Sequence, residues 1–229
     1  MKTIGLLGGM SWESTELYYR LINQGVKQQL GGLHSAQIAM VSVDFQEIET
    51  LQHSGKWGRA GEQLARMAQC VEAAGAEFLL ICTNTMHKVA PQIERSIGIP
   101  ILHIADATAE RVQQTGMTTI GLLGTRFTME QDFYKGRFER YGITVVVPSQ
   151  SDRDVVHRVI YEELCLGVVR DESRQAYLSV IEALQEAGAE GVIAGCTEIG
   201  MLVQQQHTKM PLFDTTTIHA EAAVTLALE

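Results

Sequence analysis

The octapeptide KTIGLLGG at residues 2–9 returns as TTIGLLGT at residues 118–125, 116 positions later. The segment AGAEFLLICTNT at 74–85 is echoed 113 positions later by AGAEGVIAGCTE at 187–198. Pro100 and Pro211, each ahead of a short apolar run, are 111 positions apart. Three matches in the same order and at nearly one offset indicate two homologous half-chains, each a small α/β lobe.

Apolar runs short enough for strands alternate with longer amphipathic segments along the whole chain. The runs lie at residues 3–7, 36–43, 77–82, 101–104, 118–123, 144–147, 191–194 and 212–213. Several lack strict alternation of apolar and polar residues, which is typical of parallel strands covered on both faces. Segments such as 57–73 have apolar residues at helical spacing, and the tail 215–228 also predicts a helix. The pattern predicts an α/β fold of two pseudo-symmetric lobes, each a mainly parallel sheet flanked by helices, with the active site in the cleft between the lobes.

Charge and cysteine usage narrow the function classes. The 229 residues include 18 Lys and Arg against 27 Asp and Glu, a net charge of −9, which argues against a broad surface for nucleic acid or an anionic membrane. None of the four cysteines has a partner at metal-site spacing, and a disulfide framework is not expected at this length. We therefore expect reduced thiols, no bound metal and a cytoplasmic protein. No apolar stretch is long enough for a membrane span, and Trp12 and Glu13 follow the first apolar run where a signal peptide would be cleaved.

Four loops follow matched strands of the two halves, namely GGMS (8–11), NTMH (84–87), GTRFT (124–128) and TEIG (197–200). Ligands of parallel α/β sheets bind beyond the carboxyl ends of the strands, and helix starts favour anions. The loops therefore nominate as substrate-binding residues Met10, Ser11, Asn84, Thr85, Thr125, Thr197 and Glu198. The alternative for each loop is a turn glycine followed by a helix N-cap. The chain has no P-loop and no GxGxxG motif, which argues against nucleotide chemistry.

The repeat places Thr83 opposite Cys196, each at the end of a strand. A thiol in an electropositive loop is expected to have a lowered pKa and to act as a base or nucleophile. Cys82 is expected to point into the packing, because side chains alternate along a strand. Cys70 and Cys165 are expected to be core residues on apolar helix faces.

Together these motifs are similar to those of the aspartate/glutamate racemase family, and especially of its enterobacterial branch, which includes broad-specificity amino-acid racemases. The resemblance covers essentially the whole chain, through IGLLGGMSWEST, CTNTMHKVA, RFTMEQDFY, GCTEIG and FDTTTIHA. It implies an isomerase of D-amino acid metabolism that works without pyridoxal phosphate or any other cofactor on a small amino acid. It also implies a homodimer and a tail that crosses back to the first lobe. The expected lobes are residues 1–98 plus about 210–229, and residues 99–209.

Members of this family resemble one another in using two cysteines, one per lobe, on opposite faces of the substrate Cα. The second family cysteine falls on Cys196, and the first falls on Thr83, where this chain departs from the pattern. The resemblance thus implies that Cys196 abstracts and donates the Cα proton on one face and Thr83 on the other. Because a threonine hydroxyl is far less acidic than a thiol, we expect an asymmetric enzyme that favours one enantiomer for exchange.

The substrate is less constrained than the reaction. A dicarboxylic amino acid requires a cation for its distal carboxylate, yet VDFQEIETLQ (43–52) holds no Arg or Lys. Cys165 stands where some similar aspartate racemases carry a lysine. Gln52 and hydroxyl groups would bind a carboxylate or an amide without requiring charge, which favours broad specificity. Arg126 is the alternative cation, with a surface position as its other interpretation.

Further alternatives stay open at this point. Because of Thr83, the chain is also interpretable as a catalytically silent amino-acid-binding or sensor protein. A hydantoin racemase or a maleate isomerase would share the thiol chemistry, although GGMSWEST and NTMH favour neither. Cys82 would serve the second face if the strand end were irregular. His87 either orients a neighbouring polar group or is a satisfied structural histidine.

Overall fold

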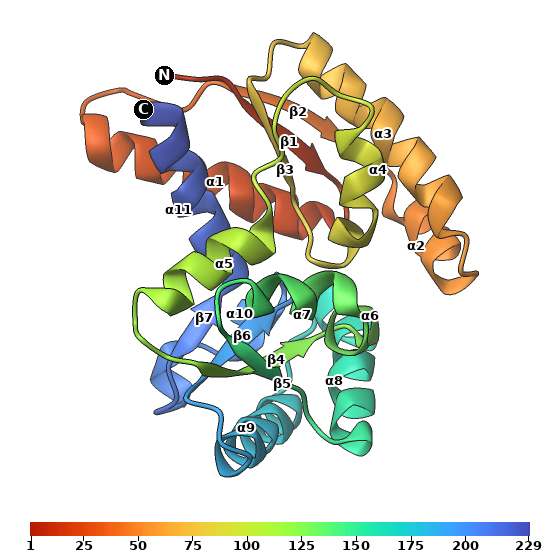
Figure 1. Cartoon of the computed structure of the whole chain (residues 1–229), viewed down its shortest axis with the longest axis vertical. Coiled ribbons are helices and arrows are strands. Elements are labelled where there is room, and N and C mark those ends of the chain that lie inside the picture. The colour runs from red at the N-terminus through yellow and green to blue at the C-terminus, as the bar shows by residue number, and fades with distance from the viewer. The chain divides into compact units, whose positions relative to one another are not determined.

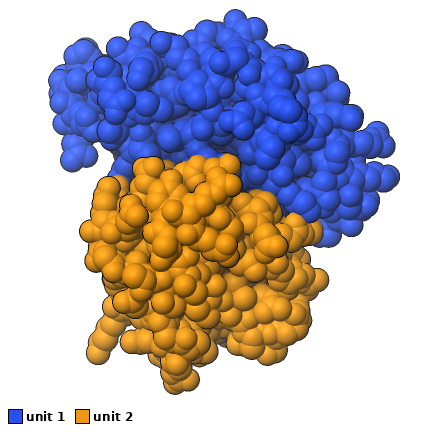
Figure 2. Space-filling view, in the orientation of Figure 1, with its two compact units in different colours: residues 1–104, 219–229 blue, residues 105–218 orange.

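The computed structural model describes all 229 residues, which form two compact units (Figure 2). Unit 1 comprises Met1–Ile104 together with His219–Glu229, and unit 2 comprises Ala105–Ile218. The chain therefore leaves unit 1 after residue 104 and returns to it at residue 219, several residues beyond the boundaries expected from the sequence. Each unit has one sheet with parallel pairing throughout, so the α/β class with two similar sheets is confirmed.

Unit 1 is built on a three-stranded sheet of order β2-β1-β3 (Figure 1). Its elements are β1 (Ile4–Gly8), α1 (Trp12–Leu30), β2 (Ile38–Ser42), α2 (Phe45–His53), α3 (Trp57–Ala73), β3 (Phe78–Ile81), the 3-10 helix η1 (Thr85–Val89) and α4 (Ala90–Glu94). Helix α11 (Thr215–Leu228) adds its residues from His219 onward. The expected helices at 57–73 and 215–228 are confirmed with these bounds.

The alternation of side chains along β1 and β3 gives this sheet two apolar faces. One face joins Ile4, Leu6, Phe78 and Leu80 to helices α1 and α11. The other face joins the remaining apolar strand side chains to α2, α3 and α4. Both faces are therefore covered, which explains why these strands lack polar alternation in the sequence.

Unit 2 is built on a four-stranded sheet of order β5-β4-β6-β7. Its elements are α5 (Ile104–Gln113, whose first residue belongs to unit 1), β4 (Thr119–Gly124), α6 (Arg126–Glu130), α7 (Asp132–Glu139), β5 (Thr144–Val146), α8 (Gln150–Glu162), η2 (Leu164–Leu166), α9 (Asp171–Glu186), β6 (Gly191–Gly195), α10 (Ile199–Leu202), η3 (Gln205–His207) and β7 (Leu212–Asp214). Within the unit, α9 packs on β4 and β6, and α8 packs on β4.

The strands of the repeat occupy matching places in the two sheets. In unit 1, β1 pairs with β3 so that Leu7 lies beside Ile81. In unit 2, β4 pairs with β6 so that Leu123 lies beside Ala194. The loops that follow β1 and β3 therefore leave the sheet of unit 1 at its carboxyl edge. The loops that follow β4 and β6 do the same in unit 2.

The fold differs from the expectations of the sequence at residues 101–104 and at Cys70. Residues 101–104 do not form a strand, because only Ile101 makes a bridge, to Leu79, before α5 begins at Ile104. Cys70 is exposed rather than in the core. It follows the buried Ala68 by two residues and precedes the buried Val71 by one, and each step along a helix turns a side chain by about 100° away from the buried stripe.

Helix α11 is mostly apolar, with Glu221 and Thr225 exposed, and it brings one histidine into the core of unit 1. The ring of His219 lies 2.8 Å from Tyr18 Oη through Nδ1 and 2.8 Å from the carbonyl oxygen of Leu102 through Nε2. A carbonyl only accepts, so Nε2 carries the hydrogen and Nδ1 accepts from the tyrosine hydroxyl. Burial lowers the pKa of His219 from 6.5 to about 4, so the ring is neutral at physiological pH.

This shift predicts a loss of stability in mild acid. The unfolded chain binds a proton at this histidine below pH 6.5, whereas the folded chain resists it down to about pH 4. The contribution of His219 to the free energy of unfolding should therefore be fully present above pH 6.5. The free energy of unfolding should fall by up to about 3 kcal/mol as the pH drops to 4. When the free energy of unfolding is measured by urea denaturation at several pH values, it should fall less steeply with decreasing pH in His219→Gln than in the wild type. His34→Gln, at an exposed position, is the control and should keep the wild-type slope.

Candidate functional site

The first candidate loop of unit 1 lies close against the end of β2. Gly9 has a φ of +90°, and a Cβ placed there would lie 2.2 Å from the carbonyl oxygen of Val43. The amide of Val43 donates to the carbonyl of Gly8 over 3.0 Å. Only glycine allows both the positive φ and this close approach, so GG at residues 8–9 lets the loop fold tightly over the sheet edge.

Ser11 then starts α1 as its N-cap. Its hydroxyl accepts from the amide of Ser14 over 3.2 Å, and its carbonyl accepts from the Thr15 hydroxyl over 2.9 Å. The Ser14 hydroxyl donates over 3.1 Å to the carbonyl of Cys82, at the end of the neighbouring strand β3. These bonds tie the first loop to the second, so the two predicted loops of unit 1 do come together.

The second loop of unit 1 begins where β3 ends. Cys82 is fully buried on the α1 and α11 face of the sheet, which raises the pKa of its thiol far above the usual range. Thr83 is half-buried and is more exposed than its neighbours on either side. The structure thus favours Thr83 over Cys82 as the residue accessible at this strand end. Asn84 and Thr85 follow it and are buried.

Gln52 and Met10 approach this loop from other elements. Gln52 is buried on α2, and its side-chain amide lies 2.9 Å from the sulfur of Met86. Met10 is buried in the same apolar cluster as Met86 and Leu7. Its side chain is therefore a packing group, whereas Gln52 brings a polar group to the edge of the loop.

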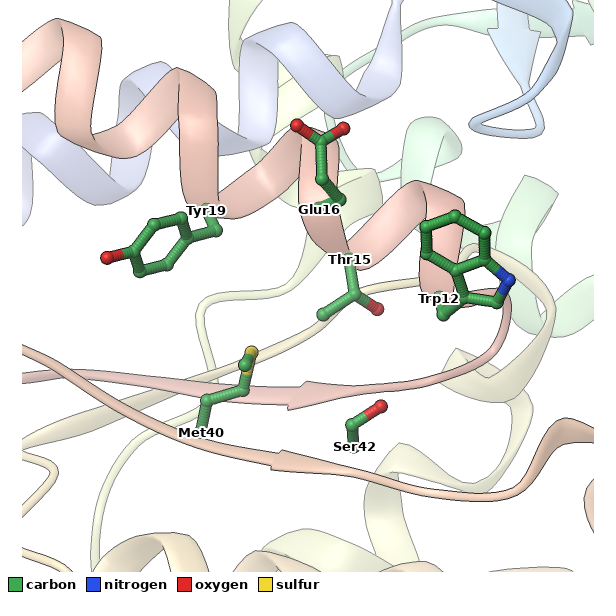
Figure 3. Close-up of a pocket in the computed structure, with 6 residues that line it drawn as sticks. All are labelled: Trp12, Thr15, Glu16, Tyr19, Met40 and Ser42. Carbon is green, nitrogen blue, oxygen red and sulfur yellow. The ribbon is translucent and has the colours of Figure 1, made fainter.

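A shallow cavity of about 320 Å³ lies next to this region, between α1 and β2. Figure 3 shows Trp12 and Tyr19 projecting from α1 on one side of it and Met40 and Ser42 from β2 on the other. None of the residues predicted to bind substrate lines it, although Trp12 directly follows Ser11. The cavity is therefore separate from the predicted site.

Unit 2 repeats the arrangement of the first loop. Thr125 is the N-cap of α6, and its hydroxyl accepts from the amide of Thr128 over 3.4 Å. The following residue, Arg126, pairs with Asp154 over 2.7 Å, with both side chains about half exposed. The guanidinium is thus engaged in a surface ion pair, which favours the surface interpretation of Arg126.

The loop after β6 holds the main chemical group of unit 2. Cys196 is half-buried, and its thiol lies 3.0 Å from Oε2 of Glu198. The Thr197 hydroxyl donates to the same oxygen over 2.6 Å. One carboxylate oxygen therefore accepts from both neighbours, and the three consecutive predicted residues form one hydrogen-bonded group.

The acidity of the Cys196 thiol differs from the expectation. The sequence predicted a lowered pKa for Cys196, but the structure raises it well above its usual range. Burial is the largest cause, and the nearby carboxylate of Glu198 is the next, since both disfavour a thiolate. Cys196 therefore rests as a thiol that donates a hydrogen bond, and Glu198 is placed to accept its proton.

Two neighbours of Cys196 were not predicted from the sequence. Cys165, expected to be a core residue, is half-buried and close enough to Cys196 to raise its pKa further. Tyr177 on α9 is a second neighbour, and its own pKa is raised, mainly by burial. No sequence motif links these residues to Cys196, because η2, α9 and β6 meet only in the folded unit. No group of three or more His, Cys, Asp or Glu side chains is arranged to hold a metal ion, and no helix combines the length and apolar character needed to cross a membrane.

Comparison with known proteins identifies close relatives. The model of the Asp/Glu/hydantoin racemase family matches residues 7–223. The crystal structure of a candidate Asp/Glu racemase from Yersinia pestis is 57% identical, with a TM-score of 0.93 and complete coverage of both chains. An aspartate racemase homologue from Pyrococcus horikoshii is 32% identical, with a TM-score of 0.87 and complete coverage of both chains. A broad specificity amino-acid racemase from Bacillus subtilis is 19% identical over 69% of this chain and 68% of its own length.

The thiol and carboxylate arrangement predicts the effect of Glu198→Gln. Removing the negative charge while keeping an oxygen acceptor should lower the pKa of Cys196 toward its usual value. At pH 8, alkylation of Cys196 by iodoacetamide should then be about threefold to tenfold faster than in the wild type, because more thiolate is present. Mass spectrometry of the peptide that contains Cys196 separates it from the other three cysteines.

Glu182→Gln provides the control for this measurement. Glu182 is an exposed carboxylate on α9, and its loss should leave the alkylation rate of Cys196 unchanged. Slower alkylation in Glu198→Gln, or equal rates in both variants, would contradict the role assigned to the Glu198 charge.

Proposed function

The chain belongs to the Asp/Glu/hydantoin racemase family, and we propose that it is an amino-acid racemase that uses Cys196 and Thr83 at the substrate Cα. The observation that carries the proposal is the hydrogen bond from the Cys196 thiol to Glu198 at the carboxyl end of β6. Thr83 supports it from unit 1, because it is the accessible residue at the corresponding end of β3. Racemisation removes the Cα proton from one face and returns a proton to the other, which requires two such groups.

On the first face, Cys196 and Glu198 act as a pair. The thiol passes its proton to the carboxylate and, as a thiolate, removes the Cα proton. In the reverse direction the protonated thiol delivers a proton to the carbanion. The resting thiol form of Cys196 suits delivery, and the 3.0 Å contact with Glu198 provides the base that abstraction needs.

On the second face, the Thr83 hydroxyl delivers a proton, which water replenishes. A hydroxyl is a poor base, so abstraction from this face is slow. The enantiomer whose Cα hydrogen faces Cys196 therefore loses and regains that hydrogen more often than it inverts. This imbalance is the asymmetry that distinguishes the chain from a racemase with two thiols.

Charge that develops on the substrate carboxylate is stabilised by polar groups at the two sheet edges. Ser11 and Thr125 are the N-caps of α1 and α6, and they lie in the loops that we assign to the substrate carboxylate. Asn84 and Thr85 are further donors, whereas the Thr197 hydroxyl donates to Glu198 and holds its carboxylate in place. All these groups are neutral, and with Gln52 they bind a carboxylate or an amide in the substrate side chain. We therefore include neutral amino acids, together with aspartate and glutamate, among the substrates.

We also propose that the protein is a homodimer in which β2 lies at the interface. β2 is an edge strand with one neighbour, and its residues 38–42 include no charge and no proline. Natural edge strands usually carry such residues as protection against pairing. Trp12, Tyr19 and Met40 beside this edge are 67%, 52% and 48% exposed, which makes an apolar surface that a second copy would cover (Figure 3).

Proton exchange tests the chemistry directly. Proton NMR of L- and D-aspartate, glutamate and neutral amino acids in D₂O should show loss of the Cα signal with the wild type. Cys196→Ser should slow this loss by about a hundredfold or more, because the group that abstracts the proton is gone. Thr83→Cys should raise the rate of inversion by about tenfold or more, since a thiol replaces a poor acid and base.

Each outcome has a defined meaning. No gain in inversion for Thr83→Cys would count against the asymmetry. No exchange by the wild type with any amino acid would remove the racemase proposal. A rise in melting temperature with an amino acid in that case would identify the chain as an amino-acid-binding protein.

The dimer is tested by Met40→Lys. A charge on the edge strand should weaken self-association by about tenfold or more, shifting the protein toward monomer in sedimentation velocity. Leu33→Lys is the matched control, because Leu33 is 100% exposed and lies outside β2 and the cavity. A monomeric wild type, or equal dissociation in both variants, would overturn the assignment of this interface.

A further inference from the structure

We propose that His87 is a positioning residue for Thr83, holding its main chain so that the threonine hydroxyl meets the substrate Cα. The proposal rests on the racemase function proposed above and assigns to His87 no contact with substrate. It follows from three features of unit 1: the two different hydrogen bonds that the ring nitrogens make, the place of Thr83 beyond the sheet, and the packing of the ring.

The ring of His87 forms hydrogen bonds through both nitrogens. Nδ1 lies 2.8 Å from the carbonyl oxygen of Thr83, and a carbonyl only accepts, so Nδ1 carries the hydrogen. Nε2 lies 3.3 Å from the amide nitrogen of Ile104, which only donates, so Nε2 is the acceptor. The two contacts therefore require one tautomer of the neutral ring, with its hydrogen on Nδ1.

Thr83 depends on this bond because the sheet does not hold it. The last paired residue of β3 is Ile81, and the amide of Cys82 makes the last bond to β1, over 3.0 Å to Leu7. The amide of Thr83 turns back to the carbonyl of Ile81 over 2.8 Å. Its carbonyl bonds to the His87 ring, so the ring fixes the peptide that follows the threonine.

The ring itself is held firmly. His87 is buried at the centre of η1, and its ring packs on that of His103 with centroids 4.3 Å apart. The His219 ring lies 6.1 Å away and is bonded to Tyr18 and to the carbonyl of Leu102. A group fixed on several sides can determine where a main-chain segment lies, whereas a flexible surface side chain cannot.

The geometry of the imidazole suggests two matched substitutions. In His87→Asn the side-chain amide nitrogen takes the place of Nδ1, which keeps the donor to Thr83 and removes the acceptor for Ile104. In His87→Gln the longer side chain places an oxygen near Nε2, which keeps the acceptor for Ile104 and removes the donor to Thr83. Each variant loses one buried hydrogen bond, so their stabilities to urea should be similar.

The readout separates the two faces of the reaction. In D₂O, exchange at the Cys196 face occurs without inversion, whereas inversion also requires delivery by Thr83. His87→Gln should lower the rate of inversion by about tenfold or more, while exchange at the Cys196 face and KM stay within about twofold. His87→Asn should keep inversion within about threefold of the wild type, because the bond to Thr83 is retained.

Equal losses of exchange and inversion in both variants would show a purely structural role and overturn the proposal. Unchanged inversion in His87→Gln would overturn it as well. If neither variant folds, long-range ¹⁵N–¹H NMR of the wild type tests the proposal, because the proposal requires His87 to carry its hydrogen on Nδ1. The opposite tautomer in an active enzyme would remove the role of His87 alone, whereas no exchange by the wild type would remove the racemase function on which the role rests.

Discussion

Parallel pairing of β1 with β3, and of β4 with β6, is the constraint on which the candidate site depends. Parallel neighbours end at the same edge of a sheet, so the loops that follow them must emerge side by side. In unit 1 the hydrogen bond from Ser14 to the carbonyl of Cys82 joins these loops. In unit 2 the same constraint sets Thr125 beside the loop of Cys196. The polar residues therefore gather by topology, and the covered faces of the sheets supply the stability.

Within this frame, electrostatics separate the two chemical groups. Burial of the Cys196 thiol and the neighbouring carboxylate of Glu198 both oppose its ionisation. A helix start favours a thiolate, but a carboxylate 3.0 Å from the sulfur acts at closer range. The thiol is therefore kept protonated until Glu198 accepts its proton. Thr83 has no such partner group in its loop and relies on where its main chain is held, which is why the His87 ring matters for the second face.

Sequence reasoning was most accurate where the signal was local. The repeat, the apolar runs and the helical spacing predicted all seven strands, the bounds of α3 and α11, and the parallel α/β class. It failed at residues 101–104, where only Ile101 bridges to Leu79 before α5 begins at Ile104. It also failed at Cys70, which lies just outside the buried stripe of α3. Periodicity identifies elements well, but it does not say which marginal residue is covered.

The sequence by itself determined the two related halves, the family motifs and the positions of Thr83 and Cys196 at equivalent strand ends, because these are properties of spacing along the chain. Only the tertiary structure decided the raised pKa of Cys196, since burial and the neighbouring Glu198 and Cys165 are properties of the folded unit. The same holds for the bonds of His87, which join residues 83, 87 and 104. Hydrogen bonds and desolvation depend on distances between groups, and such distances exist only once the chain has folded.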